Sequence, residues 1–579
     1  MANVGIERTK LDNLAVVISD RTGKPLPMKV DDMIDALGAL RTTTKDKWER
    51  PSDWPDLSKL DVSAGDVLYM TSYADEARGF CDFEVLCTGN YTVELGYISG
   101  SSFVAESTSS YASSADCILY YGSVNGTYKV IRVTGTDITK VQTNCSGVVE
   151  VNGFKGFAYT QGIIDIRGKL PSCTSLYFAT TYNLVNVDIP DINFVSGGLT
   201  SAFSNCHSLK SINTSGWNTS NITSLTNTFN GCYSLEYIDV GDWNTGNVTS
   251  LSCTFQYCTS LVYIDVSNWN TSKVTNLGST FYYCGALLYV DVSNWNTDNV
   301  TNMSSTFTNC RSLSHIDVSN WNTSKVTNMA SMFSSCSALY FVCVDGWNTE
   351  NVTSIASIFS GCSSLAYINV SNWNTGKMTS MNSAFNNCQS LISIGDVSRW
   401  NTANVTSMQA MFSSCSALLY VDVSNWNMSN VTTISSMFYA CYGLTNIDVS
   451  RWDTGKVTTI SQTFYNCYKL THIDISKWNL SGCTTSSSTG STFYNCYAIY
   501  NSITIPSTVT MIGTNFLGGT RSIYEYHFKS TTPPTLNSTS AFSNMTDFGG
   551  KKIYVPSASL SAYQTASNWS TYASYMVGE

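Results

Sequence analysis

The stretch DVSNWNTSKVTN at residues 265–276 returns almost unchanged, as DVSNWNTDNVTN at 291–302 and as DVSNWNTSKVTN at 317–328. Its tryptophan recurs every 26 residues, and a fixed period of this length is typical of stacked repeats. The same period argues against catalysis, because an active site needs unlike side chains that converge on one point. The series comprises Trp217, Trp243, Trp269, Trp295, Trp321, Trp347 and Trp373, and after one inserted residue Trp400, Trp426, Trp452 and Trp478.

Within one repeat the apolar positions form two groups. Leu261, Ile264 and Val266 have the spacing of a leucine-rich-repeat strand. The later apolar residues, between 274 and 284, are spaced by three, four and three, which predicts one face of a short helix with Thr275 as its N-cap. The sequence therefore predicts an α/β repeat solenoid, with one strand and one short helix in each repeat of about 26 residues.

The repeat resembles the BspA-like leucine-rich repeats, in the variant D-V-S-x-W-N-T-x-x-V-T-x-M-x-x-M-F, here at 317–333. The resemblance extends over about residues 184–500. ITIPSTVTMIG at 503–513 is similar to a related repeat, and residues 552–569 are similar to the segment that closes such arrays. The resemblance implies a bacterial surface or adhesive protein, which binds a receptor and is not an enzyme.

The rest of the chain suggests further parts around the solenoid. Short runs rich in Val, Tyr and Ile, separated by Gly, Asn and Ser, predict a small antiparallel β-sandwich or meander before the repeats. The expected organisation is a helical hairpin for attachment at 1–44, a small β-rich module at 45–160, the solenoid at 161–500, and a capping repeat with a closing segment at 501–579.

Composition narrows the possible partners. The net charge is −10 and no basic patch is evident, which argues against binding to nucleic acid. The sequence contains no run of 18 apolar residues, so insertion into a membrane is not expected. The start, MANVGIERTKLDNLAVV, lacks the apolar core of a signal peptide, so export by that route is not expected.

The first 57 residues suggest a different location. RTGKPLP at 21–27, followed by a predicted helix at 33–40, resembles the short N-terminal modules of phage tail and tail-fibre proteins. WERPSDWPDL at 48–57 resembles segments of phage structural proteins. These resemblances imply docking of 1–44 on tail or baseplate proteins, a homo-oligomer, and location in the virion, which is released by lysis without a signal peptide. The alternative for this segment is a two-helix capping hairpin such as any bacterial protein can have, and the alternative location is the bacterial cell surface.

Two ladders are expected to be structural. Eleven exposed indoles would favour aggregation, so we expect the tryptophans to be buried at a corner of each turn; a track for stacking sugar rings is the alternative. A cysteine follows a phenylalanine by three residues twelve times, from Cys206 to Cys496. We expect these thiols to be free and to line the core, as small apolar side chains do.

Candidate ligand-binding residues lie on the outward face of the predicted strands, where an aromatic or polar position alternates with aspartate. Tyrosine beside aspartate suits sugar recognition, through ring stacking and acceptance of hydroxyl hydrogens; an ordinary exposed strand face is the alternative. The candidates are Tyr237, Asp239, Tyr263, Asp265, Tyr289, Asp291, His315, Asp317, Tyr367, Tyr420, Asp422, His472 and Asp474.

We expect the aspartate row to be exposed and hydrogen-bonded to Ser or Thr, with bound Ca²⁺ as an alternative. Cys343 and Asn369 interrupt the row, which argues against an obligatory metal, so no cofactor is expected. A glycosidase needs two carboxylates in different environments, one as acid and one as base, and the sequence shows no such pair. The sequence therefore predicts a phage tail or baseplate-associated protein that binds a bacterial surface glycan or protein by many weak contacts, with a bacterial cell-surface adhesin as the alternative.

Overall fold

The fold is known from a computed structural model, which forms two compact units. The first unit extends to residue 316 except for residues 301–305, which belong to the second unit. The helical hairpin expected at 1–44 lies outside the described residues. None of the described helices has the length and apolar character needed to cross a membrane. The structure describes residues 49–74, 80–120, 127–143, 148–151, 154–157, 162–543 and 549–579.

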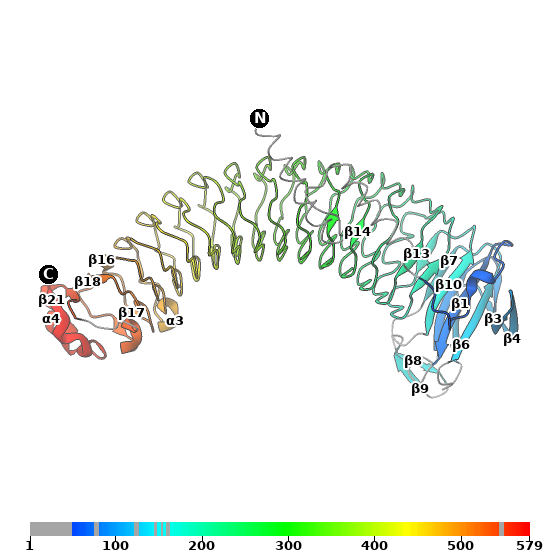
Figure 1. The fold of residues 1–579 in the computed structure, drawn as a ribbon, viewed down its shortest axis with the longest axis horizontal. Helices are drawn as coiled ribbons and strands as arrows, with labels where there is room; N and C mark the ends of the chain where they lie inside the picture. Colours follow the sequence, from blue (N-terminus) through cyan, green and yellow to red (C-terminus); the bar gives the residue numbers. More distant parts are fainter. Residues whose placement is uncertain are drawn as a thin grey trace, which may run out of the picture. The chain divides into compact units, whose positions relative to one another are not determined.

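The first unit begins with a β-rich module. Its larger sheet has seven strands in the order β13-β12-β10-β1-β6-β3-β4, the smaller sheet has the order β11-β7-β2-β5, and β8 pairs with β9 (Figure 1). The described elements of the whole first unit, of which β14 and β15 lie in later solenoid turns, are η1 (Leu57–Lys59), β1 (Val67–Ala74), β2 (Phe80–Leu86), β3 (Asn90–Ser99), β4 (Ser102–Ala112), β5 (Asp116–Tyr120), β6 (Thr127–Thr134), β7 (Lys140–Thr143), β8 (Val148–Val151), β9 (Phe154–Phe157), β10 (Ile163–Lys169), β11 (Ser175–Tyr177), β12 (Asn186–Asp188), β13 (Ser211–Asn213), β14 (Tyr263–Ile264) and β15 (Tyr289–Val290).

Strand β1 is central to the larger sheet. It runs antiparallel to both β6 and β10, and its consecutive residues Val67, Leu68, Tyr69 and Met70 are all buried. On one face Val67 and Tyr69 pack with Leu57 of η1. A strand buried on both faces reads as a continuous apolar run, because neither face alternates with solvent.

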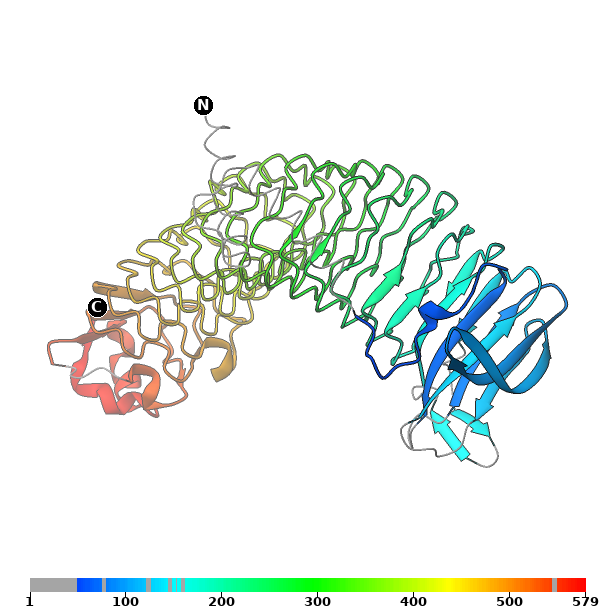
Figure 2. The same ribbon diagram turned by 45° about the vertical axis from the view of Figure 1, so that its right-hand side comes forward.

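The first turns of the solenoid extend both sheets of the β module. β12 pairs in parallel with β10, and β13 with β12, while β11 pairs in parallel with β7 (Figure 2). At this junction the buried carboxylate of Asp165 lies 2.6 Å from the Arg50 guanidinium and accepts a hydrogen bond from Asn186 Nδ2 at 2.8 Å. Burial raises the pKa of Asp165, and the nearby Arg50 charge opposes that rise. The module therefore covers the N-terminal end of the solenoid core.

The tryptophans form a buried column at one corner of the turns, as predicted. No indole from Trp217 to Trp478 is more than 6% exposed. In the first unit the rings of Trp269 and Trp295 are parallel within 1°, with centroids 6.3 Å apart. Nε1 of Trp269 donates to the carbonyl of Val240 in the preceding turn at 3.0 Å. An indole bonded in this way fixes the register of its turn on the turn before.

The prediction of a short helix in each turn is wrong. Between 251 and 258 the backbone forms two successive β-turns in which Thr254 N–H donates to Leu251 and Cys258 N–H to Phe255. The third residue of each turn has a positive φ, 56° at Cys253 and 60° at Tyr257, as in type II turns. Intervening N–H groups, such as that of Phe255, donate to the next turn instead of to a helical i−4 carbonyl.

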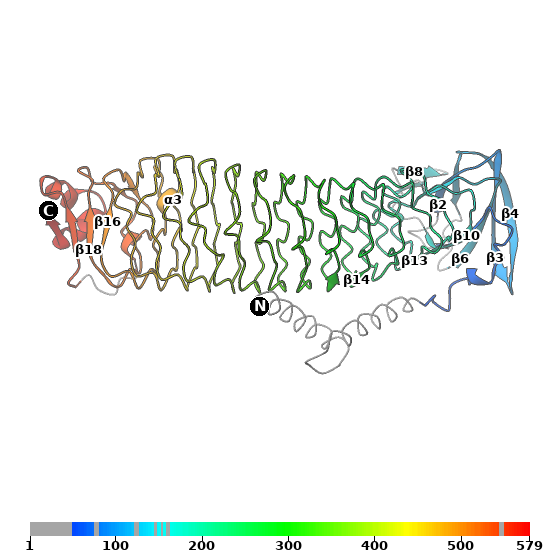
Figure 3. The same cartoon turned by 90° about the horizontal axis from the view of Figure 1, so that it is seen from above.

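The predicted strand is also shorter than expected in most turns. At its position β14 pairs with β15 over two residues, and Tyr367 forms a single bridge with Ser393, whereas other isolated parallel bridges, such as Ser224 with Ser250, lie after the tryptophan. Thr275, expected as a helix N-cap, instead donates from its N–H to Thr249 O at 2.9 Å. The described solenoid is therefore a repeat β-solenoid of about 17 turns with few helices, whose turns follow one another as parallel loops (Figure 3).

The cysteine ladder lines the core with free thiols, as predicted. Cys258 and Cys415 are fully buried and free. The thiol of Cys258 donates to Phe229 O at 3.2 Å, and that of Cys415 to Phe385 O at 3.0 Å, each in the preceding turn. Burial raises the pKa of Cys415 to about 12, so this thiol stays protonated at neutral pH.

The second unit ends in a closing segment. Its sheet β16-β18-β20-β21 is parallel, and Trp569 Nε1 donates to Pro534 O at 2.8 Å beneath α4. The described elements are α3 (Ser486–Thr489), β16 (Asn501–Ile505), β17 (Met511–Ile512), β18 (Ile523–Phe528), β19 (Thr535–Leu536), η3 (Thr539–Phe542), β20 (Lys552–Val555), η4 (Ser557–Ser559), α4 (Leu560–Thr565), η5 (Trp569–Tyr575) and β21 (Met576–Gly578).

Removal of one indole tests the tryptophan column. We expect Trp452→Ala to lower the free energy of unfolding by about 3–5 kcal/mol, because it leaves a cavity in a packed core. It also removes the hydrogen bond from Trp452 Nε1 to Val423 O, which is 3.0 Å long. Tyr367→Ala, at a side chain that is 48% exposed, should change it by no more than about 0.5 kcal/mol. Urea denaturation followed by circular dichroism measures both values, and equal losses would contradict the structural role of the column.

The buried thiols predict a loss of stability at alkaline pH. An unfolded thiol ionises near pH 9 and the folded Cys415 thiol near 12, so the unfolded state binds fewer protons above pH 9. The free energy of unfolding should therefore fall as the pH rises from about 9 to 12. Cys415→Ala should reduce that slope by at most about 1.4 kcal/mol per pH unit. Urea denaturation at several pH values measures the slope, and an unchanged slope in the variant would contradict burial of this thiol.

Candidate functional site: a groove between two solenoid turns

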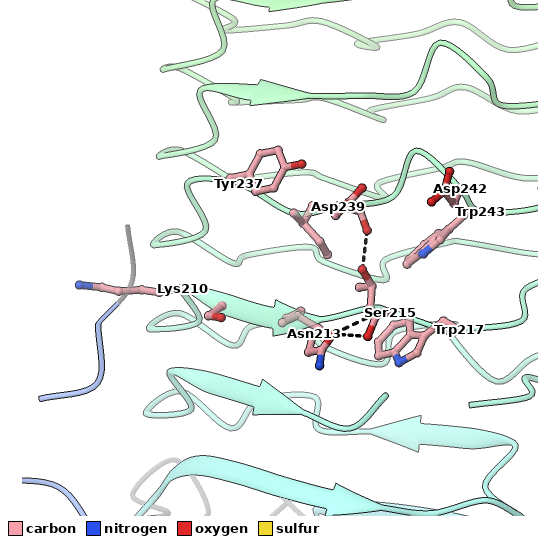
Figure 4. A pocket seen from close by; sticks show the side chains of 13 residues that line it. Lys210, Asn213, Ser215, Trp217, Tyr237, Asp239, Asp242 and Trp243 are labelled. Atoms are coloured by element: carbon pink, nitrogen blue, oxygen red, sulfur yellow. Dashed lines mark hydrogen bonds between the residues drawn. The ribbon is translucent and has the colours of Figure 1, made fainter. Parts of the chain in front are cut away.

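A groove of about 560 Å³ lies in the first unit, where the segments 210–217 and 237–243 face each other (Figure 4). The first segment contains β13 and ends at Trp217, and the second is the equivalent part of the next turn. The groove is lined by Lys210, Ser211, Ile212, Asn213, Thr214, Ser215, Gly216, Trp217, Tyr237, Ile238, Asp239, Asp242 and Trp243.

The two turns are less closely matched here than elsewhere in the first unit. β13 is the edge strand of its sheet, and residues 235–240 belong to no strand. The rings of Trp217 and Trp243 are inclined by 23°, compared with 4° between Trp243 and Trp269. Ile212 is half-buried, whereas Ile264 in a later turn is fully buried. The mismatch leaves the groove between them.

The local sequence accounts for this mismatch. Where later turns read D-V-S-N before tryptophan, residues 213–216 read N-T-S-G. Thr214 therefore replaces a buried valine, and its hydroxyl donates to Asp239 O at 2.6 Å across the groove (Figure 4). Gly216 has φ +69°, and a Cβ there would lie 2.0 Å from Asp191 Oδ1. The backbone at the corner of this turn thus depends on glycine.

Asn213 within the groove is held by its own turn and by the turn before it. Asn213 Oδ1 accepts hydrogen bonds from Ser215 N at 3.1 Å and Ser215 Oγ at 2.7 Å, and Asn213 Nδ2 donates to Asp188 Oδ1 at 2.8 Å. Asp239 differs from its counterparts in other turns, because residue 241 is glycine and offers no hydroxyl. The groove thus combines fixed amide groups with carboxylates and aromatic rings.

Charge is divided along the groove. The Lys210 ammonium lies at one end, and the carboxylates of Asp239 and Asp242 lie toward the other, with Asp242 near Trp243 (Figure 4). The aromatic part of the lining consists of Trp217, Tyr237 and Trp243. The small exposed parts of these rings can contact the apolar face of a sugar, while the carboxylates accept hydrogen bonds from its hydroxyl groups.

The structure brings two of the sequence-predicted site residues, Tyr237 and Asp239, into this groove. Tyr237 is 9% exposed, so only a small part of its side chain reaches the surface. The other predicted residues of the first unit lie elsewhere on the turns. Tyr263 and Tyr289 pair across β14 and β15, Asp265 and Asp291 accept the hydroxyl hydrogens of Ser267 and Ser293, and His315 is buried.

In the second unit the predicted residues form a more exposed row. Tyr420 is 52% exposed, and its pKa is raised by partial burial and then by the carboxylates of Asp422, Asp448 and Asp396. The described residues contain no cluster of three or more His, Cys, Asp or Glu that fits a metal ion. Asp317 and Asp422 accept the hydroxyl hydrogens of Ser319 and Ser424, Asp474 accepts the N–H of Ser476, and Tyr367 and His472 are exposed.

Sequence reasoning missed several lining residues, among them Lys210, Asn213, Thr214 and Asp242. These residues could have been identified because residues 213–216 differ from the repeat sequence. A polar residue at a position that is otherwise a buried valine changes how two turns can pack, and it therefore marks this turn as different from the others.

Comparison with protein families identifies a family to which the repeats are similar. A family model described as Mycoplasma protein of unknown function, DUF285, matches more than half of the chain. The matches fall on the tryptophan repeats, where the resemblance to BspA-like repeats lies; the resemblance of 1–44 to phage tail proteins stays a prediction. No curated protein matches the chain significantly. The matched stretches are 197–315, 258–341, 287–393, 340–441 and 379–505.

Substitution of Gly216 tests the backbone of the groove. We expect Gly216→Ala to lower the free energy of unfolding by about 1–3 kcal/mol, because a side chain at positive φ is strained and its Cβ would collide with Asp191. Gly246→Ala is the matched control, since its Cβ would meet only side-chain atoms at 3.3 Å or more. Urea denaturation compares the two, and a neutral Gly216→Ala would show that the turn does not need glycine.

Proposed function

The chain belongs to the DUF285 family, and we propose that it is an adhesive protein that binds a bacterial surface glycan in the groove between residues 210–217 and 237–243. The groove carries this proposal, because the rings of Trp217 and Tyr237 and the carboxylate of Asp239 all line it. Repeat solenoids offer long surfaces built from regular turns, and they serve binding more readily than catalysis.

Affinity would come from many weak contacts. The exposed tyrosines and aspartates of the second unit, such as Tyr367, Tyr420 and Asp422, add further contact points for a polymeric ligand. Contacts of this kind multiply when several sites on one chain, or several copies of the chain, engage the same surface. A surface polysaccharide presents repeated sugar units and therefore fits such a set of sites better than a single small molecule.

The finer part of the proposal concerns location. We propose that the protein is carried on a phage tail or baseplate, to which residues 1–44 attach it, and that it forms a homo-oligomer there. The resemblance of residues 1–57 to phage structural proteins supports this location. A bacterial cell-surface adhesin of the same repeat family is the second candidate, which the resemblance to adhesive BspA-like repeats favours.

Binding to whole cells tests the glycan proposal. The full-length chain should bind cells of its host, and mild periodate, which cleaves vicinal diols of sugars, should abolish binding whereas protease treatment should not. Asp239→Asn and Tyr237→Ala should each weaken binding about tenfold or more, which corresponds to about 1.4 kcal/mol. Asp265→Asn, the same substitution at an aspartate outside the groove, is the matched control.

Two results would contradict this proposal. Loss of binding after protease but not after periodate would identify a protein receptor. Equal weakening by Asp239→Asn and Asp265→Asn would show that the groove has no special part in binding.

Fractionation tests the location. If the protein is a tail component, it should sediment with purified phage particles, and a chain that lacks residues 1–44 should be absent from them while staying folded by circular dichroism. Recovery of the protein in washed envelopes of uninfected bacteria, and not in particles, would favour the cell-surface adhesin instead.

A further inference from the structure

The indole of Trp243 departs from the pattern of the column. Neighbouring indoles donate to the carbonyl three residues before the preceding tryptophan, as Trp269 does to Val240 and Trp295 to Val266. For Trp243 the equivalent carbonyl belongs to Thr214, but no described residue accepts a hydrogen bond from its Nε1. The side chain is only 5% exposed, and it lines the groove.

An indole N–H can only donate a hydrogen bond, so the group that completes this site must be an acceptor. A buried donor without a partner is unfavourable, and a ligand that supplies an acceptor removes that penalty on binding. The unpaired N–H therefore gives the groove a preference for one kind of ligand atom at one position.

The charges of the groove restrict the acceptor further. Asp242 lies near Trp243, and Asp239 lines the same part of the groove (Figure 4). Two carboxylates repel an anionic acceptor, and this repulsion grows as water is excluded from the groove. A neutral carbonyl oxygen meets the requirement of the indole without that repulsion, whereas a carboxylate or phosphate oxygen does not.

The remaining walls fit the rest of such a group. Ile212 and the rings of Trp217 and Tyr237 offer apolar surface to a methyl group or to the apolar face of a sugar. We propose that the groove binds a 2-acetamido sugar. Its amide carbonyl accepts the hydrogen bond from Trp243 Nε1, and its hydroxyl groups donate to Asp239. This inference rests on the proposed function and specifies its ligand class.

Calorimetric titration of the full-length chain tests this inference with two matched neutral probes. One is a trisaccharide of N-acetylglucosamine, and the other is the glucose trisaccharide with the same linkage. We expect the acetamido trisaccharide to bind at least tenfold more tightly. Trp243→Phe keeps the aromatic ring but removes the N–H, so it should bring the ratio of the two affinities close to one.

Trp269→Phe is the matched control. It removes an indole N–H that is already bonded to Val240 O at 3.0 Å, so it should lower the urea midpoint more than Trp243→Phe but keep the tenfold preference. Preservation of the preference in Trp243→Phe, or equal binding of both trisaccharides, would overturn this inference and leave sugar binding standing. Binding of neither trisaccharide would overturn it as well, and binding to intact cells that is lost with Asp239→Asn would still support the groove as a glycan site.

Discussion

Most indoles of the tryptophan column are joined by Nε1 to a backbone carbonyl of the preceding turn, as Trp269 shows in the first unit and Trp373 in the second, where the distance is 3.2 Å, whereas Trp243 lacks this bond. The bond satisfies two polar groups inside an apolar core, which would be costly if left unpaired. Thiols follow the same rule, because Cys258 donates to a carbonyl of the turn before. Packing and hydrogen bonding therefore select the same register, and the groove lies where that agreement fails.

The sequence predicted the repeat, the buried indoles and the free thiols, because each depends only on period and on burial. It did not predict the conformation between the ladders. Two type II turns and a short helix both bury residues at spacings of three and four, so the apolar pattern cannot separate them. Glycine or asparagine usually marks a positive φ, but Cys253 and Tyr257 occupy these positions. The neighbouring turn, which accepts their N–H groups, decides the outcome.

The candidate site was partly predictable. The outward face suggested Tyr237 and Asp239, and both line the groove. The repeat could not distinguish them from the same pair in later turns, because a period treats every turn alike. The difference comes from residues 213–216 on the neighbouring turn, where Thr214 replaces a buried valine and Gly216 permits an unusual backbone. The candidate site therefore lies where the sequence departs from the repeat.

The direction of the indole bond has a consequence for how such chains change length. A typical turn bonds its indole to the turn before it and offers the carbonyl of its buried valine to the indole of the turn after it, so an added turn needs no new kind of contact. The extra residue before Trp400 is taken up at Gly395, with φ 84°, while Trp400 still donates to Val370 O. Recombination between near-identical repeats in the gene would therefore lengthen or shorten the reach of the protein in whole turns, while the β module and the closing segment stay the same.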